Sequence, residues 1–247
     1  MNILSPCYEI IEDDEIPDTE YLVAGFPGTG LIGGIASEQM INTLDMVQVA
    51  SLTCDEFPPT SVIFDGIPRR PVRFFSGHGL LLVKSDMVIP HNQAAKLAKE
   101  IVEWAIGKGV KEIIVLDAIP KNKDTDEEKI WGIISMHDHR EAVESLDIEI
   151  IERGAISGIS STLLLETIEH DVKAMGMLAE GIQKLPDPRS SAALLDKLAE
   201  YLDLDIETEA LIESADQLEK EFEEMVQQTE NLKKDMNGKS AHPPLYG

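Results

Sequence analysis

A glycine-rich segment, Gly28-Thr29-Gly30-Leu31-Ile32-Gly33, has the G-x-G-x-x-G spacing of a dinucleotide-binding turn. In such turns the glycines let the backbone approach a pyrophosphate, which the first N–H groups of the next helix bind. Pro27 removes one N–H donor, and the first 68 residues contain no Lys or Arg to balance a phosphate. We therefore favour a structural turn in which two backbone segments pack closely. A nucleotide- or nucleoside-binding enzyme that uses residues 28–33 is the alternative.

The other polar residues form no recognisable catalytic or metal-binding constellation. Asp117 follows a buried strand, a position where both catalytic acids and turn-capping acids occur. His137-Asp138-His139 lacks the further ligands that a metal site needs, so we expect a solvated helix start. Gly158-Ile159-Ser160 resembles a loop cradle, but the nearby sequence has no base to activate the serine. The sequence thus predicts no catalytic residue, no metal and no cofactor, and a protein that is not an enzyme.

The last three residues, Leu245-Tyr246-Gly247, place a tyrosine behind an apolar residue at the end of the sequence. The ring supplies contact area and a hydroxyl, and a terminal carboxylate can pair with a buried lysine of another protein. The alternative is a disordered end that binds nothing. The sequence therefore predicts a partner-binding segment at Leu245, Tyr246 and Gly247.

Composition excludes several classes of partner. The net charge of the 247-residue chain is −25, and aromatic residues make up only 5%. Such a charge repels phosphate backbones and anionic lipids, so we expect neither nucleic acid nor a membrane as partner. No signal peptide and no apolar run long enough to span a membrane is evident, which predicts a cytoplasmic protein. The two cysteines, Cys7 and Cys54, are predicted to be free thiols.

Apolar runs alternate with amphipathic segments as far as Leu178. Strands are predicted at Tyr21–Phe26, Val47–Cys54, Val72–Phe75, Leu80–Lys84, Glu112–Leu116, Trp131–Ser135 and Val172–Leu178. Helices are predicted at Leu31–Leu44, His91–Ile106, His137–Ser145, in Gly154–Ile168, at Ser190–Leu202 and at Glu207–Met236. The alternation predicts an α/β fold with a mixed, largely parallel sheet flanked by helices. The third and fourth predicted strands are expected to form a hairpin, whose strands are antiparallel, so we expect a mixed sheet.

The composition shifts to acidic helix formers after Leu185-Pro186-Asp187-Pro188. We predict a core domain at 1–186, acidic helices at 187–236 and a flexible tail at 237–247. Residues 187–235 hold fifteen acids and five bases. The last helix repeats every seven residues, which favours a pairing seam within or between subunits, or one face packed on its own domain. The seam residues are Leu211, Leu218, Phe222, Met225 and Leu232.

Five segments together resemble the proteasome assembly chaperone 2 family in its archaeal branch. The resemblance spans about residues 20–235. The segments are Gly25-Phe26-Pro27-Gly28-x-Gly30, Phe57-Pro58-Pro59, Gly154-x-Ile156-Ser157-Gly158, Asp187-Pro188-Arg189-Ser190-Ser191-Ala192-Ala193 and Leu202-Asp203-Leu204-Asp205-Ile206.

The resemblance implies a fold similar to that of nucleoside phosphorylases, without their chemistry. It also implies a homo-oligomer and an ATP-independent chaperone that binds proteasome α-subunits. Some members use a C-terminal hydrophobic–Tyr–any tail, and Leu245, Tyr246 and Gly247 match it residue by residue. Chaperoning of α-ring assembly and activation of finished proteasomes both fit this expectation.

Overall fold

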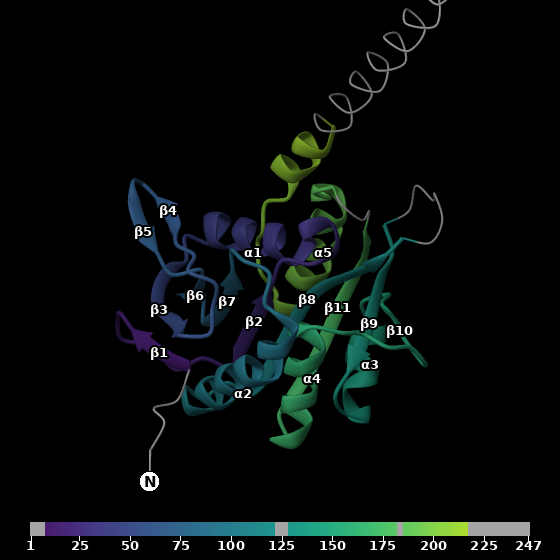
Figure 1. Cartoon of the computed structure of the whole chain (residues 1–247). Coiled ribbons are helices and arrows are strands. Elements are labelled where there is room, and N and C mark those ends of the chain that lie inside the picture. Colours follow the sequence, from purple (N-terminus) through teal and green to yellow (C-terminus); the bar gives the residue numbers. More distant parts are fainter. Residues whose placement is uncertain (1–7, 122–127, 182–184, 217–247) are drawn as a thin grey trace, which may run out of the picture.

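A computed structural model describes residues 8–121, 128–181 and 185–216 of the chain (Figure 1). The N-terminal part contains β1 (Tyr8–Glu12), β2 (Tyr21–Gly25), η1 (Thr29–Leu31), α1 (Ile32–Thr43), β3 (Val47–Cys54), β4 (Val62–Phe64), β5 (Ile67–Arg69), β6 (Val72–Gly77) and β7 (Leu80–Ser85). The C-terminal part contains α2 (His91–Gly107), β8 (Glu112–Pro120), β9 (Ile130–Ile134), η2 (His137–His139), α3 (Arg140–Glu144), β10 (Glu149–Ile150), α4 (Ile159–Glu169), β11 (Lys173–Gly181) and α5 (Pro188–Leu202).

Nine of these strands form one sheet in the order β1-β3-β6-β7-β2-β8-β11-β9-β10. The four central strands, β7, β2, β8 and β11, are parallel, and so is the β9–β10 pair. The strands β1, β3 and β6 are antiparallel to their neighbours, as is β9 to β11. The predicted mixed α/β fold is confirmed, with its parallel part concentrated at the centre of the sheet. The sheet is not largely parallel as predicted, because four of its eight strand pairs are antiparallel.

The sheet is covered on both faces, and alternate residues of its central strands enter two different cores (Figure 1). In β2, Leu22 and Ala24 pack with α2 and α4, whereas Val23 packs with α1 and α5. This is the two-residue period of a strand that is buried on both sides. Burial on both faces explains why the central strands consist of continuous apolar residues instead of alternating apolar and polar ones.

Most predicted elements are found within a few residues of their expected bounds. The strand predicted at Val47–Cys54 is β3, with the same bounds, and the predicted hairpin is β6–β7. The prediction missed β1, β10 and the separate β4–β5 hairpin. The strands β4, β5 and β10 have only two or three residues, too few to show a periodic pattern, and β5 carries Pro68. In β1, Glu9 and Glu12 interrupt the apolar residues, so no apolar run marks this strand.

The helix α5 lies against α1 and β11, and its apolar face is buried in the same core as α1. It starts at Asp187, whose side chain accepts a hydrogen bond from the Ser190 N–H, as an N-cap does. The division at residue 187 stays a prediction, but α5 itself belongs to the layer that covers the sheet. Residues 209–216 are helical; Leu211 packs in the same core as α1 and α5, and Ala215 is also buried.

The remaining seam residues lie outside the described residues, so the pairing of the long helix stays a prediction. The ion pair of Arg189 with Asp216, at 2.6 Å, ties the described start of that helix to α5. Leu218, Phe222, Met225 and Leu232 belong to the part of the chain that the structure does not describe.

The prediction of a solvated helix start is wrong for His139. Its side chain is only 3% exposed, whereas His137 and Asp138 are exposed. The His139 Nε2 lies 2.9 Å from the Tyr201 hydroxyl and 3.2 Å from Glu112 Oε1, and the same Tyr201 hydroxyl donates to Glu112 at 2.8 Å. Burial, followed by the Glu112 contact, raises the pKa of Tyr201. The cluster joins β8, η2 and α5, which no local pattern reveals.

The prediction of free thiols is wrong for Cys54, which takes part in a disulfide bond. Cys7, the only other cysteine of the sequence, lies outside the described residues. Among the described helices, none combines the length and apolar character needed to cross a membrane.

Candidate functional site

Several residues that the sequence singled out separately meet in one pocket at the carboxyl ends of the parallel strands. Gly28 follows β2, His91 begins α2, Asp117 ends the buried part of β8, and Ser160 lies in the first turn of α4. The pocket has a volume of about 370 Å³. It is lined by Phe26, Pro27, Gly28, Thr29, Val88, Ile89, His91, Asp117, Ala118, Ile119, Pro120, Ala155, Ile156, Ser157, Gly158, Ile159, Ser160 and Leu178.

Strand order explains why these residues converge. The chain leaves β2 through α1, passes through β3 to β6 and reaches β7 on one side of β2, and then crosses through α2 to β8 on the other side. Connections that depart on opposite faces leave a crevice at the carboxyl ends of the strands between them. Ligands bind there in open α/β sheets, so we take this strand-end pocket as the first candidate site.

Asp117 is the acidic residue in the lining of the strand-end pocket. Burial raises the pKa of its carboxyl, and hydrogen bonds from the Ser160 hydroxyl and the Ala118 N–H only partly oppose this. The Ala118 N–H donates to Asp117 Oδ1 at 2.8 Å. No described Lys or Arg lines the pocket. The carboxylate is therefore held by dipoles alone and can accept a further hydrogen bond.

The glycine-rich turn has two different roles at its two ends. A Cβ on Gly33 would lie 2.5 Å from the Leu116 carbonyl oxygen, so this glycine lets α1 pack directly on β8. A Cβ on Gly28 would lie 2.9 Å from Asp117 Oδ1, at the wall of the pocket. The close backbone packing that the sequence predicted is thus found at Gly33, and the pocket lies beside Gly28.

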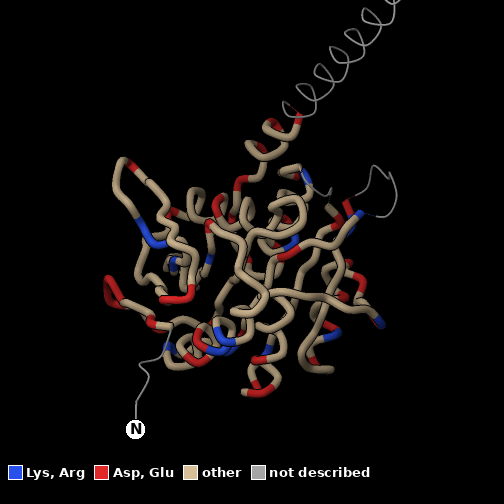
Figure 2. Tube along the Cα trace, viewed as in Figure 1, with Lys and Arg blue, Asp and Glu red and all other residues tan. Residues whose placement is uncertain are grey.

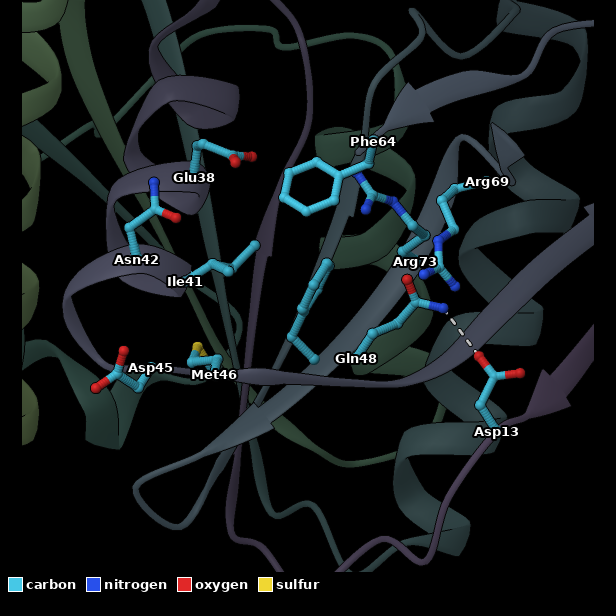
Figure 3. A pocket seen from close by; sticks show the side chains of 11 residues that line it. Asp13, Glu38, Ile41, Asn42, Asp45, Met46, Gln48, Phe64, Arg69 and Arg73 are labelled. Atoms are coloured by element: carbon cyan, nitrogen blue, oxygen red, sulfur yellow. Dashed lines mark hydrogen bonds between the residues drawn. The ribbon is translucent and has the colours of Figure 1, made fainter. Parts of the chain in front are cut away.

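A second and larger hollow, of about 700 Å³, lies between α1 and the β4–β5 hairpin (Figure 3). Figure 3 shows Glu38 and Ile41 of α1 facing Phe64 of the hairpin across it. We call it the hairpin hollow. It is lined by Asp13, Glu38, Ile41, Asn42, Asp45, Met46, Gln48, Phe64, Arg69, Arg73 and Phe75.

The hairpin hollow combines exposed apolar side chains with charges of both signs. Ile63, Phe64 and Ile67 of the hairpin are each more than half exposed. Arg69, at the end of β5, makes no hydrogen bond or ion pair with the described residues, and Arg73 Nε is buried without a partner among them. Figure 2 shows basic residues at the base of this hairpin, in a chain whose charge is otherwise acidic.

Two residues that line the hairpin hollow, Arg73 and Glu38, belong to a largely buried network of ion pairs. Asp86 accepts from Arg73 at 2.7 Å and from Lys84 at 2.8 Å, and both cations are more than nine-tenths buried. Glu38 of α1 also pairs with Lys84. Although burial by itself raises the pKa of Asp86, the hydrogen bonds from Lys84 and Arg73 lower it overall. The network therefore fixes β6, β7 and α1 relative to one another.

The site residues predicted at the chain end, Leu245, Tyr246 and Gly247, lie outside the described residues. Sequence reasoning missed the hairpin hollow, although one signal was present. Arg69, Arg70 and Arg73 are the first basic residues of the chain and follow one another closely. A cluster of this kind in an acidic sequence is a reason to expect a charged surface.

Comparison with known proteins identifies the family. Residues 22–226 match the PAC2 family, and the chain belongs to this family. An uncharacterised protein of Methanocaldococcus jannaschii is 31% identical over 207 residues, which are 84% of this chain and 85% of that protein. The resemblance stated from the sequence motifs is thereby confirmed.

The fold is similar to that of solved structures of archaeal proteins. Pyrococcus furiosus PbaA, described as an archaeal homolog of proteasome-assembly chaperone, is 28% identical with a TM-score of 0.85. The match covers 94% of this chain and 97% of PbaA. P. furiosus PbaB, described as an archaeal proteasome activator, is 22% identical with a TM-score of 0.78. That match covers 92% of this chain and all of PbaB, and it shows the shared fold.

Proposed function

We propose that this protein is an ATP-independent chaperone that binds proteasome α-subunits and takes part in their assembly. The observation that carries the proposal is membership of the PAC2 family, together with the fold shared with PbaA along almost its full length. The function is that of a binding protein and not of an enzyme. We expect it to act in the cytoplasm without a cofactor.

We further propose that Leu245, Tyr246 and Gly247 form the docking segment. The apolar Leu245 and the Tyr246 ring would fill a pocket on an α-subunit, and a carboxylate at Gly247 would meet a lysine there. Several such segments on one homo-oligomer would raise the effective concentration, so a modest affinity at each site suffices.

Tyr246→Ala should abolish recovery of α-subunits in a pull-down with the full-length protein. Loss of a buried aromatic anchor typically weakens one contact by about 2 kcal/mol or more, roughly thirtyfold, and the loss recurs at each docked copy. Tyr246→Phe is the matched control, because it keeps the ring and should retain most of the binding. Residues appended after Gly247 test the carboxylate separately. Equal recovery by Tyr246→Ala and the unchanged protein would remove this segment from the mechanism.

We also propose that the hairpin hollow contacts a second copy of this chain. A chain of net charge −25 repels its own copies over most of its surface. The hairpin hollow differs, because Arg69 lines it together with Asp13, Glu38 and Asp45. A surface with both signs of charge can pair with itself across a two-fold axis, and the exposed apolar hairpin supplies area to bury. The seam from Leu211 to Leu232 is proposed to extend the same assembly.

The double variant Ile63→Ser/Phe64→Ser should lower the mass in light scattering toward one chain of 27.3 kDa. Burying apolar area contributes about 25 cal/mol per Å², so two large side chains are a substantial part of a small interface. Leu165→Ser, an equally exposed position on α4, is the control and should leave the mass unchanged. Phe222→Ser tests the seam in the same series. Dissociation by Leu165→Ser alone would place the contact on α4 instead.

A further inference from the structure

The strand-end pocket has no part in the docking of α-subunits proposed above. Its volume of about 370 Å³ lies at the lower end of the range for small-molecule sites. Its walls combine apolar side chains, such as Val88 and Ile156, with polar groups in nearly equal measure. Such a mixture can both enclose and orient a small ligand.

The charges around the strand-end pocket limit the ligand. The titratable side chains of its described lining are Asp117 and His91, without a Lys or Arg. A phosphate would approach a buried carboxylate with no cation to balance it, in a chain whose net charge is −25. A dinucleotide or a mononucleotide is thus disfavoured. A ligand that offers N–H donors and carries no negative charge is favoured, because it supplies what the carboxylate lacks.

The geometry around Asp117 leaves the carboxylate open to such a donor. Oδ1 accepts the Ala118 N–H at 2.8 Å and the carboxylate also accepts the Ser160 hydroxyl, whereas a carboxylate has about four acceptor directions in all. Gly28 stands beside this oxygen, and a Cβ there would come within 2.9 Å of it. The glycine therefore leaves room where any other residue would crowd the acceptor. Ser157, an exposed residue that lines the pocket, adds a hydroxyl.

We propose that the strand-end pocket binds an uncharged nucleobase or nucleoside, with Asp117 accepting N–H groups from the edge of the base. Carboxylates pair well with the amino and ring N–H groups of bases, and the flat faces of bases suit apolar lining side chains such as Val88 and Ile156. This is a binding site that is separate from the proposed docking segment. The proposed ligand carries no phosphate, unlike the dinucleotide for which the G-x-G-x-x-G spacing is typical.

Isothermal titration of the full-length protein with adenosine and guanosine, and with AMP as the charged comparison, tests this proposal. We expect saturable binding of at least one nucleoside and at least tenfold weaker binding of AMP. Asp117→Asn should weaken the binding of nucleoside about tenfold or more, because a hydrogen bond to a charged group is lost. Gly28→Ala should weaken this binding as well, because its Cβ would crowd Asp117 Oδ1.

Two further measurements distinguish a loss of binding from a loss of folding. Asp117→Asn removes a buried charge that has no cation partner among the described residues, so its melting temperature without ligand should be unchanged or higher. Asp138→Asn, an exposed position on η2, is the control for loss of one negative charge and should bind like the unchanged protein.

The proposal is overturned if neither nucleoside binds, if AMP binds as tightly as adenosine, or if Asp117→Asn binds nucleoside as well as the unchanged protein does. Its failure is distinguishable from failure of the proposed docking segment. Tyr246→Ala should keep its full response to nucleoside whatever it does to recovery of α-subunits.

Discussion

Replacing Gly33 with alanine should destabilise the fold by about 3 kcal/mol, the upper part of the range for overpacking a buried site. The added Cβ would lie 2.5 Å from the Leu116 carbonyl oxygen and 3.0 Å from that of Phe26. Both contacts are with backbone, so no side chain can rotate away to relieve them. The helix α1 would have to move off the sheet, and Ile32 and Ala36 would lose part of their burial with it.

Gly34 provides a matched control within the same helical turn. A Cβ on Gly34 meets nothing within 4 Å, so Gly34→Ala adds only helix propensity. It should stabilise the protein by about 0.5 kcal/mol. Urea unfolding of the two variants at equal protein concentration measures the difference. Similar midpoints for Gly33→Ala and Gly34→Ala would show that α1 does not depend on this close approach.

Asp86→Asn should lower the free energy of unfolding by about 3–5 kcal/mol at neutral pH. The substitution leaves Arg73 and Lys84 buried without their shared carboxylate, and a buried charge that loses its partner is costly. Glu38→Gln removes a half-exposed partner of the same Lys84 and should cost about 1 kcal/mol or less. Chemical unfolding of both variants gives the comparison.

The same substitution should change how stability depends on pH. The folded-state pKa of Asp86 lies below that of an unfolded aspartate, which is about 3.9. Its ionised form therefore stabilises the fold above pH 4, and this contribution is lost as the pH falls through the lowered pKa. Asp86→Asn should lack that part of the acid dependence. An equally steep loss of stability in the variant below pH 4 would contradict this account of the network.

The apolar patterns of the sequence were sufficient for most elements and for the α/β class. The helix predicted at His91–Ile106 is α2 within one residue, and the strand predicted at Val47–Cys54 is β3. These segments are long, and their burial follows the period of their own backbone, so neighbouring residues reveal it. Family membership was also evident from short motifs, because turns such as Gly25-Phe26-Pro27-Gly28 combine residues with narrow backbone requirements.

The two hollows and the buried polar groups were decided by the tertiary structure. Gly28, Asp117 and Ser160 are far apart in sequence, and they meet because β8 lies beside β2 and α4 returns over the same sheet edge. His139 is buried because α5 brings Tyr201 to it. The pattern of apolar residues in a segment shows which face of that segment will be buried. Contacts between segments depend on strand order and on connections across the sheet, and these are set by the free energy of packing the whole chain.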